Sequence, residues 1–207
     1  MKDIFRVIDK KNRETSFEYD LKNNDEIDLT IAAFIVRDTD IQIRVKLNEN
    51  AKFNGKIALL GSGTHKVNID YLAVHSGKNS KSVFRLNGVL ANGIEKQTKM
   101  KIQFRPGAKN AEGSEFEKIT MLDDSCKNIC LPIIDSSEEE MHGSHGMSSG
   151  KIDKNIRRYL ASRGLSKNKI QELLIKSDIF ALLKNIDKNQ IQLVEEQLNI
   201  FCEENNV

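Results

Sequence analysis

The stretch Ile41-Gln-Ile-Arg-Val-Lys-Leu47 alternates apolar and polar side chains over its whole length. Such alternation puts the apolar side chains on one face of an extended strand and the polar ones on the other. The stretch therefore predicts a half-buried β-strand, and similar short runs occur on both sides of it. These runs cover residues 27–36, 41–47, 56–60, 67–74, 83–90, 98–104, 116–121 and 129–134.

Turn-forming residues separate these runs, and no helical periodicity of useful length appears among them. Many short strands without helices indicate a sandwich, a barrel or a β-solenoid. Small residues recur just before strands, in Asn50-Ala51, Gly107-Ala108 and Asn110-Ala111. Small residues let one coil turn and stack on the next, so this weak repeat favours the solenoid.

The flanks differ from this β-rich core of residues 27–150. Residues 1–26 are polar, and we expect one or two short strands there at most. After Gly150 the pattern becomes helical, with cap residues at Asp153, Ser166 and Asp187. Residues 151–207 therefore predict about three amphipathic helices, whose apolar stripes must pack on the sheet, on each other or on a partner.

Composition limits the possible functions. The 207 residues carry 32 basic and 30 acidic side chains, a net charge of +2, which gives no argument for binding nucleic acid. No apolar run is long enough to span a membrane, and we expect neither membrane insertion nor a signal peptide. Three cysteines argue against a secreted disulfide scaffold and favour reduced thiols in the cytoplasm. No phosphate-binding loop is present, so we expect this chain to bind no nucleotide.

The chemistry concentrates in residues 123–150, which hold Cys126, Cys130, His142, His145 and the run Glu138-Glu-Glu140. Thiolates, imidazoles and carboxylates at such density can bind iron, zinc or an iron–sulfur cluster, or carry sulfur as a persulfide. The polar neighbours of Cys126 predict an exposed thiol whose pKa is lowered by Lys127.

Other candidates have simpler explanations. Cys130 alternates with apolar neighbours, so it is as readily a small buried side chain as a ligand. Cys202 lies beside Phe201 on the last helix, and we expect it to be buried. The glutamate run is more often a solvated turn than a metal site. His65 and His75 lie among turn residues, where surface positions are expected.

Three motifs together resemble the C-terminal signature of the SufB/SufD family of the SUF iron–sulfur cluster assembly system. They are Pro132-Ile-Ile-Asp135, Gly143-Ser-His-Gly-Met-Ser-Ser-Gly-Lys-Ile-Asp153 and Tyr159-Leu-Ala-Ser-Arg-Gly-Leu165. The resemblance is specific over residues 122–165, looser from about Ala33 to Met121, and not visible in the first 26 residues. The chain is much shorter than typical members, whose large N-terminal part has no counterpart here.

The resemblance implies a right-handed parallel β-helix followed by a helical subdomain, with a SufC-like ABC-type ATPase bound at those helices. It also implies pairing of two cores through their β-helices, as a homodimer or with a SufB/SufD-like paralogue, and a cysteine desulfurase or other sulfur donor. Cys126 stands six residues before Pro132, as the SufB thiol does, and His145 matches the histidine of the following turn. After that histidine SufB has a glutamate. This chain has Gly146 there instead, and in this it resembles SufD.

Three hypotheses follow from these observations. The first is a non-enzymatic scaffold that holds sulfur, iron or a transient iron–sulfur cluster at Cys126 and His145. Cys130, His142, Glu138, Glu139 or Glu140 are possible further ligands. The second is a SufD-like subunit that only supports a SufB partner. The third, from another class, is a metal-dependent β-solenoid enzyme built on His142, His145 and a glutamate. For the ATPase contact we expect Ile170, Leu173, Leu174, Ile191, Val194 and Leu198, while Ile156, Tyr159 and Leu160 pack inward.

Overall fold

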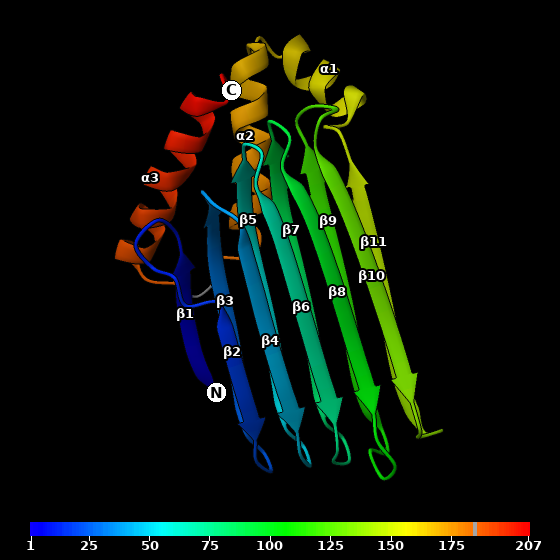
Figure 1. The fold of residues 1–207 in the computed structure, drawn as a ribbon. Helices are drawn as coiled ribbons and strands as arrows, with labels where there is room; N and C mark the ends of the chain where they lie inside the picture. The colour runs from blue at the N-terminus through cyan, green and yellow to red at the C-terminus, as the bar shows by residue number, and fades with distance from the viewer. Residues whose placement is uncertain (184–185) are drawn as a thin grey trace.

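The computed structural model describes residues 1–183 and 186–207, and Figure 1 shows strands stacked side by side with helices against one face. The strands are β1 (Lys2–Ile8), β2 (Ser16–Leu21), β3 (Glu26–Ile35), β4 (Thr39–Leu47), β5 (Lys52–Ser62), β6 (Lys66–His75), β7 (Lys81–Ala91), β8 (Glu95–Phe104), β9 (Ala111–Met121), β10 (Lys127–Ser136) and β11 (Met141–Gly150). The helices are α1 (Lys154–Ser162), α2 (Lys167–Phe180) and α3 (Lys188–Glu204).

Odd-numbered and even-numbered strands form two separate parallel sheets. Sheet A has the order β1-β3-β5-β7-β9-β11, and sheet B has the order β10-β8-β6-β4-β2. Each coil therefore places one strand in each sheet, which makes a flattened β-solenoid with its core between the sheets. This confirms the predicted fold class. Residues 1–26, which the sequence set apart, form the strands of the first coil, β1 and β2.

Asparagines build one corner of four successive coils. Asn24, Asn50, Asn79 and Asn110 all adopt positive φ, a conformation that asparagine tolerates better than most residues. The Asn50 amide donates to Asn24 Oδ1 at 3.1 Å, and the Asn79 amide donates to Asn50 Oδ1 at 3.1 Å. The side chains thus form a ladder along the corner. It explains why the sequence repeats asparagine followed by a small residue before a strand.

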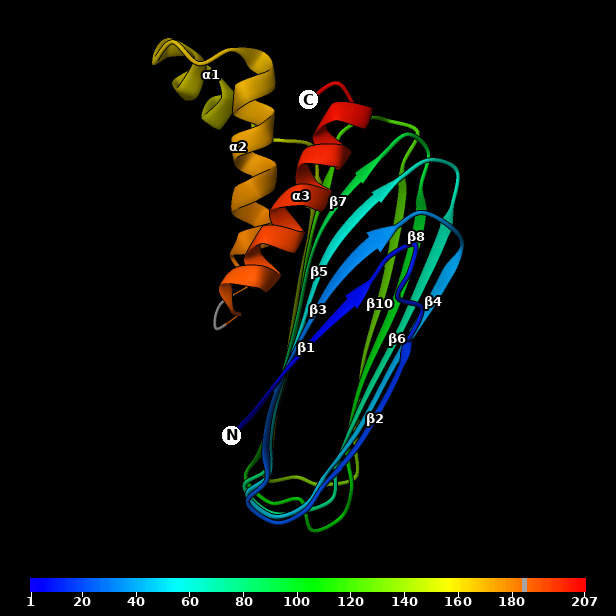
Figure 2. The same ribbon diagram turned by 90° about the vertical axis from the view of Figure 1, so that its left-hand side faces the viewer.

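Helices α2 and α3 cover the outer face of sheet A, whereas the outer face of sheet B carries no helix (Figure 2). The strands present small or apolar side chains such as Ala32, Ala58 and Val89, on which Ile179 and Val194 pack. Burying these apolar faces is what stabilises the two helices, because short helices are marginal alone.

One carboxylate fixes the position of α2 on the sheet. The Asp178 carboxylate accepts hydrogen bonds from Lys118 Nζ at 2.5 Å and from Thr120 Oγ1 at 2.9 Å. The Asp178 backbone carbonyl accepts one from the Asn87 side-chain amide at 2.8 Å. These three partners come from β7 and β9, so α2 is tied to the strands by both packing and polar contacts.

Helix α1 stands clear of the strands on the far side of α2 (Figure 2). It has no buried residue, and Ile156 and Tyr159 are 49% and 58% exposed. Our expectation that this helix packs inward is wrong. The sheet face is already filled by α2 and α3, so the stripe of α1 faces solvent. No helix in residues 1–183 and 186–207 is long and apolar enough to cross a membrane.

Candidate functional site at the open end of the solenoid

The interior of the solenoid changes from apolar to polar along its axis. In the first coils the inward positions hold residues such as Leu29, Ile43 and Phe53, all almost completely buried. From β8 onward charged and polar groups join apolar ones such as Met100 and Ile119. The polar groups are Lys96 and Thr98 on β8, Glu115 and Glu117 on β9, Asn128 and Cys130 on β10, and His145 and Ser149 on β11. The C-terminal end of the solenoid, formed by β10 and β11, is therefore its polar end, and we call it the open end.

A buried ion pair lies at the centre of this polar interior. Lys96 Nζ is 2.7 Å from Glu117 Oε2, and their side chains are 0% and 1% exposed. Asn128 completes the pair, because its Oδ1 accepts from Lys96 at 3.0 Å and its Nδ2 donates to Glu117 Oε1 at 3.1 Å. Burial lowers the pKa of Lys96, while the Glu117 carboxylate opposes that shift.

Glu115 lies beside this pair without a partner. Its side chain is completely buried, and both carboxylate oxygens lack a hydrogen bond, as do Tyr71 Oη and Thr98 Oγ1. Burial raises the pKa of Glu115 to about 8, so the carboxyl is held in its protonated form near neutral pH. Buried polar atoms without partners are rare and often mark functional sites.

Cys130 points into this interior from the edge strand β10. It is half-buried against the core, and burial followed by the Glu117 charge raises the pKa of its thiol to about 12. The thiol is therefore held protonated. The side chain faces inward and is partly buried, as one of the two sequence interpretations expects, whereas its role as a ligand stays a prediction.

The structure contradicts the exposed thiol predicted at Cys126. This side chain is only 8% exposed and belongs to the main core. Its Sγ lies 3.6 Å from Asp123 Oδ1, and burial, aided by the Asp123 charge, raises its pKa. Lys127, expected to lower that pKa, instead pairs with Glu95 at 2.6 Å. The prediction was wrong because Ser125 and Lys127, on either side of Cys126, are exposed, whereas Cys126 itself points into the core.

Register shows how far His145 lies from each cysteine. Tyr71 and Phe84 stack across the core with ring centroids 4.3 Å apart. Strand pairing carries these two positions forward to Pro132 and His145 in the last coil. At about 3.3 Å per residue, Cys130 is offset from His145 by about 7 Å along the strands and Cys126 by about 20 Å. One chain thus brings His145 nearer to Cys130 than to Cys126.

The other proposed ligands lie at the opposite end of β10 and β11 from Cys126. The Glu138 carboxylate accepts from the backbone of Gly107 at 2.9 Å and of Glu139 at 3.1 Å, so it closes its own turn. Glu140 pairs with Lys109 at 2.8 Å. Glu139 and His142 are exposed there. In residues 1–183 and 186–207, no group of three or more His, Cys, Asp or Glu side chains is arranged to hold a metal ion.

The remaining sequence candidates fall into two groups. Ile170, Val194 and Leu198 are buried and unavailable at the surface, whereas Leu173 is 45% exposed and Leu174 and Ile191 are partly buried. Cys202 is buried, as expected.

His75, expected at the surface, is instead completely buried. It lies between Ser80 and Ser82, with its ring nitrogens 2.8 Å from each hydroxyl. Burial lowers the pKa of its imidazole to about 4, so it is neutral. Its inward position follows from the alternation of β6.

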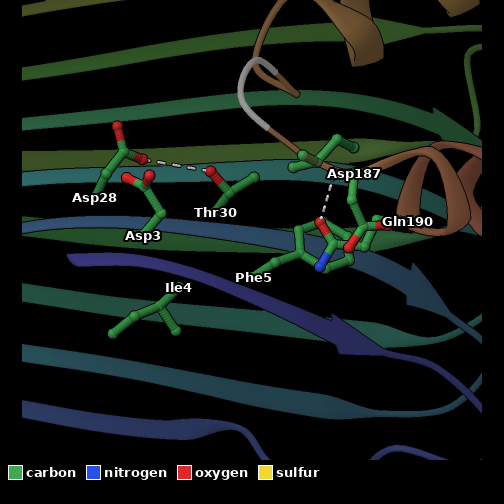
Figure 3. Close-up of a pocket in the computed structure, with 8 residues that line it drawn as sticks. Asp3, Ile4, Phe5, Asp28, Thr30, Asp187 and Gln190 are labelled. Carbon is green, nitrogen blue, oxygen red and sulfur yellow. Dashed lines mark hydrogen bonds between the residues drawn. The ribbon is translucent and has the colours of Figure 1, made fainter.

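A separate pocket lies between the first coil and the start of α3 (Figure 3). Three carboxylates line it, those of Asp3, Asp28 and Asp187. Asp28 is occupied by Lys56 at 2.8 Å, and Asp187 caps α3 by accepting from the Gln190 backbone at 2.9 Å. These two polar groups have partners within the chain, so the pocket is a seam where α3 meets the first coil.

The molecule is thus a parallel β-solenoid whose polar open end carries thiols and an imidazole, flanked by helices on one sheet. The model for the SUF system FeS cluster assembly SufBD core domain matches residues 15–178. The chain is also 22% identical over 148 residues to the Iron-sulfur cluster assembly protein SufD of Bacillus subtilis (strain 168). That alignment covers 69% of this chain and 34% of the relative, so the chain spans about a third of the length of SufD. The chain belongs to the SufBD core family.

The buried carboxyl of Glu115 predicts an unusual pH dependence of stability. The folded state holds a proton up to about pH 8, whereas the unfolded chain releases it near 4.5. Stability should therefore fall as pH rises through this window, by about 1.4 kcal/mol per pH unit at most. Glu115→Gln keeps the site neutral and should remove this loss.

The free energy of unfolding in urea is measured for wild type and Glu115→Gln at several pH values between about 5 and 8. In this window Glu115 is protonated only in the folded state. His75, whose pKa is lowered to about 4, gains stability for the fold as pH rises from about 4 toward its ordinary value of 6.5. This contribution is the same in both proteins and cancels in their difference. Parallel curves for the two proteins would contradict the assignment of Glu115.

Proposed function

We propose that this chain is a scaffold component of a SUF-type assembly complex and that its open solenoid end holds sulfur, iron or a nascent cluster. The observation that carries this proposal is the placement of Cys130 and His145 at the polar end, with Cys126 at the adjoining corner. Family membership supports the context. Nothing in the proposal requires catalysis by this chain, and ATP hydrolysis is assigned to a separate SufC-like subunit.

Two copies of the chain supply the ligands that one copy lacks. Ile129 lies midway between Cys126 and Pro132 on β10. A two-fold axis passing beside Ile129, perpendicular to sheet B, brings Cys126 of the second copy to the level of His145. In this register Cys130 pairs with Asn128 of the second copy, so the two Cys130 residues are diagonal neighbours about 7–8 Å apart. The site is thereby completed across a homodimer, with sulfur and imidazole donors from both copies, a set suited to iron.

The edge strand β10 has the features such a dimer needs. Its outer face exposes Ile129, Leu131 and Ile133 by 52%, 46% and 37%, an apolar stripe on an unpaired edge. Lys127 donates its backbone N–H toward β8, so alternate residues, including Asn128 and Cys130, direct theirs to the free edge. An axis at Ile129 pairs Asn128 with Cys130 of the second copy and Cys130 with Asn128 of the second copy. Pro132, which has no N–H, then lies at the end of the ladder.

Strand β9, which precedes β10 in the chain, is not a free edge. In the structure β9 is paired on both sides, by β7 and β11, so the free edges are β10 and β11.

For the ATPase we propose the surface of α1 and the exposed side of α2. Ile156, Tyr159 and Leu173 are exposed there, and residues 151–169 carry seven lysines and arginines against one acidic residue. A basic surface with apolar side chains fits an acidic groove on the partner. The buried stripe of α3 belongs to the chain itself.

A second candidate function is a SufD-like subunit that supports a SufB partner without holding the cargo. The burial of Cys126 and the glycine at position 146 favour it. The metal-dependent enzyme has no comparable support, since the described residues contain no metal-binding group of three or more ligands.

Anaerobic reconstitution with iron and sulfide tests the scaffold role. Losing an outer-shell partner of a metal ligand already costs about 10- to 100-fold in affinity, so losing a ligand should cost at least that. Cys126→Ser, Cys130→Ser and His145→Ala should each lose most of the bound iron and the cluster absorption. Cys202→Ser, on α3, is the matched control and should bind as wild type does. Equal cluster content in wild type and in all three site variants would favour the SufD-like subunit.

The dimer is tested with Ile129→Asp, analysed by size exclusion with light scattering. The side chain is half-exposed in the single chain, so the variant should fold. In the dimer the two carboxylates meet at the axis, where like charges repel. We expect a dimer for wild type and a monomer for Ile129→Asp, while Leu173→Asp on α2 should remain dimeric. A dimer that survives Ile129→Asp would rule out this edge.

The ATPase contact is tested by a pull-down of a SufC-like ATPase with Tyr159→Asp. Truncating or charging an apolar anchor at a contact typically costs at least about 2 kcal/mol, which is roughly a 30-fold loss of affinity. Ile129→Asp serves here as the matched control and should bind normally. Binding of Tyr159→Asp at wild-type strength would place the contact elsewhere.

A further inference from the structure

Asn128 connects more strands at the open end than any neighbouring side chain described above. It lies on β10 and accepts from Lys96 on β8 at 3.0 Å. Its amide nitrogen donates to Glu117 on β9 at 3.1 Å and to Ser149 on β11 at 3.3 Å. One side chain thus joins the last two strands of both sheets, and it uses both of its donor hydrogens and its acceptor oxygen to do so.

The Asn128 contacts matter because β10 is otherwise held on one side only. Its backbone pairs with β8, and its other edge is free. Across the core, the contact from Asn128 to Ser149 is the hydrogen bond that ties β10 to the last strand of the opposite sheet. Cys130 lies two residues further along β10 on the same inward face. Any movement of β10 away from β11 at Asn128 therefore exposes Cys130 and the interior behind it.

We propose that Asn128 is a positioning residue that clasps the open end of the solenoid and controls access to Cys130 and to the polar interior. In the closed state the clasp keeps the thiol half-buried. When β10 moves away from β11, Lys96 and Glu117 keep their direct contact, so the buried ion pair survives while Cys130 becomes accessible. The clasp is thus a gate whose opening does not unfold the coil.

The gate deepens the proposed function, because it decides when the Cys130 thiol meets sulfur or iron. Its biological role rests on that proposed function, whereas its existence does not. The chemistry of the clasp itself can be measured without either. Four groups with charge or titratable protons face Cys130. They are Lys96 from β8, Glu115 and Glu117 from β9, and, by register, His145 from β11.

Thiol labelling of the full chain tests the gate. Iodoacetamide is applied to the native protein over a range of pH, and each cysteine is quantified by mass spectrometry after trypsin. Cleavage after Lys127 separates Cys126 from Cys130, and Cys202 lies in a third peptide. A partly buried thiol labels faster when the structure opens locally, so a change in its labelling rate between variants reports a change in the opening equilibrium.

In Asn128→Ala we expect Cys130 to label about tenfold faster, the factor that corresponds to about 1.4 kcal/mol in the opening equilibrium. The pH profile of Cys130 should also shift toward that of an ordinary thiol, near 8.5. Ser149→Ala removes only the link to β11 and should shift the rate in the same direction by less. Asn68→Ala, which loses one bond to Asp40 on the outer face, is the matched control and should change nothing.

Cys126 and Cys202, both buried, report whether the whole molecule loosens. An unchanged rate and pH profile of Cys130 in Asn128→Ala would overturn the gate. Equal acceleration at all three cysteines would also overturn it, because Asn128 would then be a residue of general stability. Either result is independent of iron binding, so a failed reconstitution and a failed gate are distinguishable.

Discussion

The backbone ladder between successive parallel strands is the constraint on which the other features depend. Because every strand pairs in register with the strand one coil later, a side chain's surroundings are set by its position within the coil. Phe84, Glu115 and His145 are successive members of one such column. The column is apolar at Phe84 and becomes polar at Glu115 and His145, toward the C-terminal end of the stack. His145 is exposed, since no further strand covers it.

The same constraint explains why charge is tolerated inside the last coils. An ionised lysine and glutamate are costly to bury, and the pair is tolerated only when its remaining donors and acceptors are satisfied. Asn128 supplies those contacts for Lys96 and Glu117. Glu115, two residues away, has no such partner and is held protonated instead. In many proteins, replacing such a buried ion pair with apolar residues leaves stability unchanged or increases it. The presence of these groups is therefore better explained by a function of the open end than by stability.

The sequence predicted the architecture well because a solenoid is specified locally. Alternation in residues 41–47 and the asparagine corners at Asn50 and Asn110 need only their own neighbours to be read. The centre of the site was missed for a related reason. Even-numbered residues of β8 and odd-numbered residues of β9 face inward. Lys96, Glu115 and Glu117 occupy such positions, so extending the alternating pattern through these charged residues would have placed them in the core. Cys126 was misjudged because polarity of sequence neighbours says little at a corner, where adjacent residues face opposite ways.

The two edges of sheet B differ in the side chains that they present. At the first end, the outer side of β2 carries Glu18 and Asp20, charges of the kind that keep an edge from pairing. At the other end, β10 carries only apolar side chains from Ile129 to Ile133 on that face. An unprotected edge is a liability unless a partner covers it. The edge left open is also the one beside the polar interior. In the proposed homodimer, pairing of the two β10 edges also brings in the donors of the second copy, so the dimer contact and the completion of the proposed site are one event.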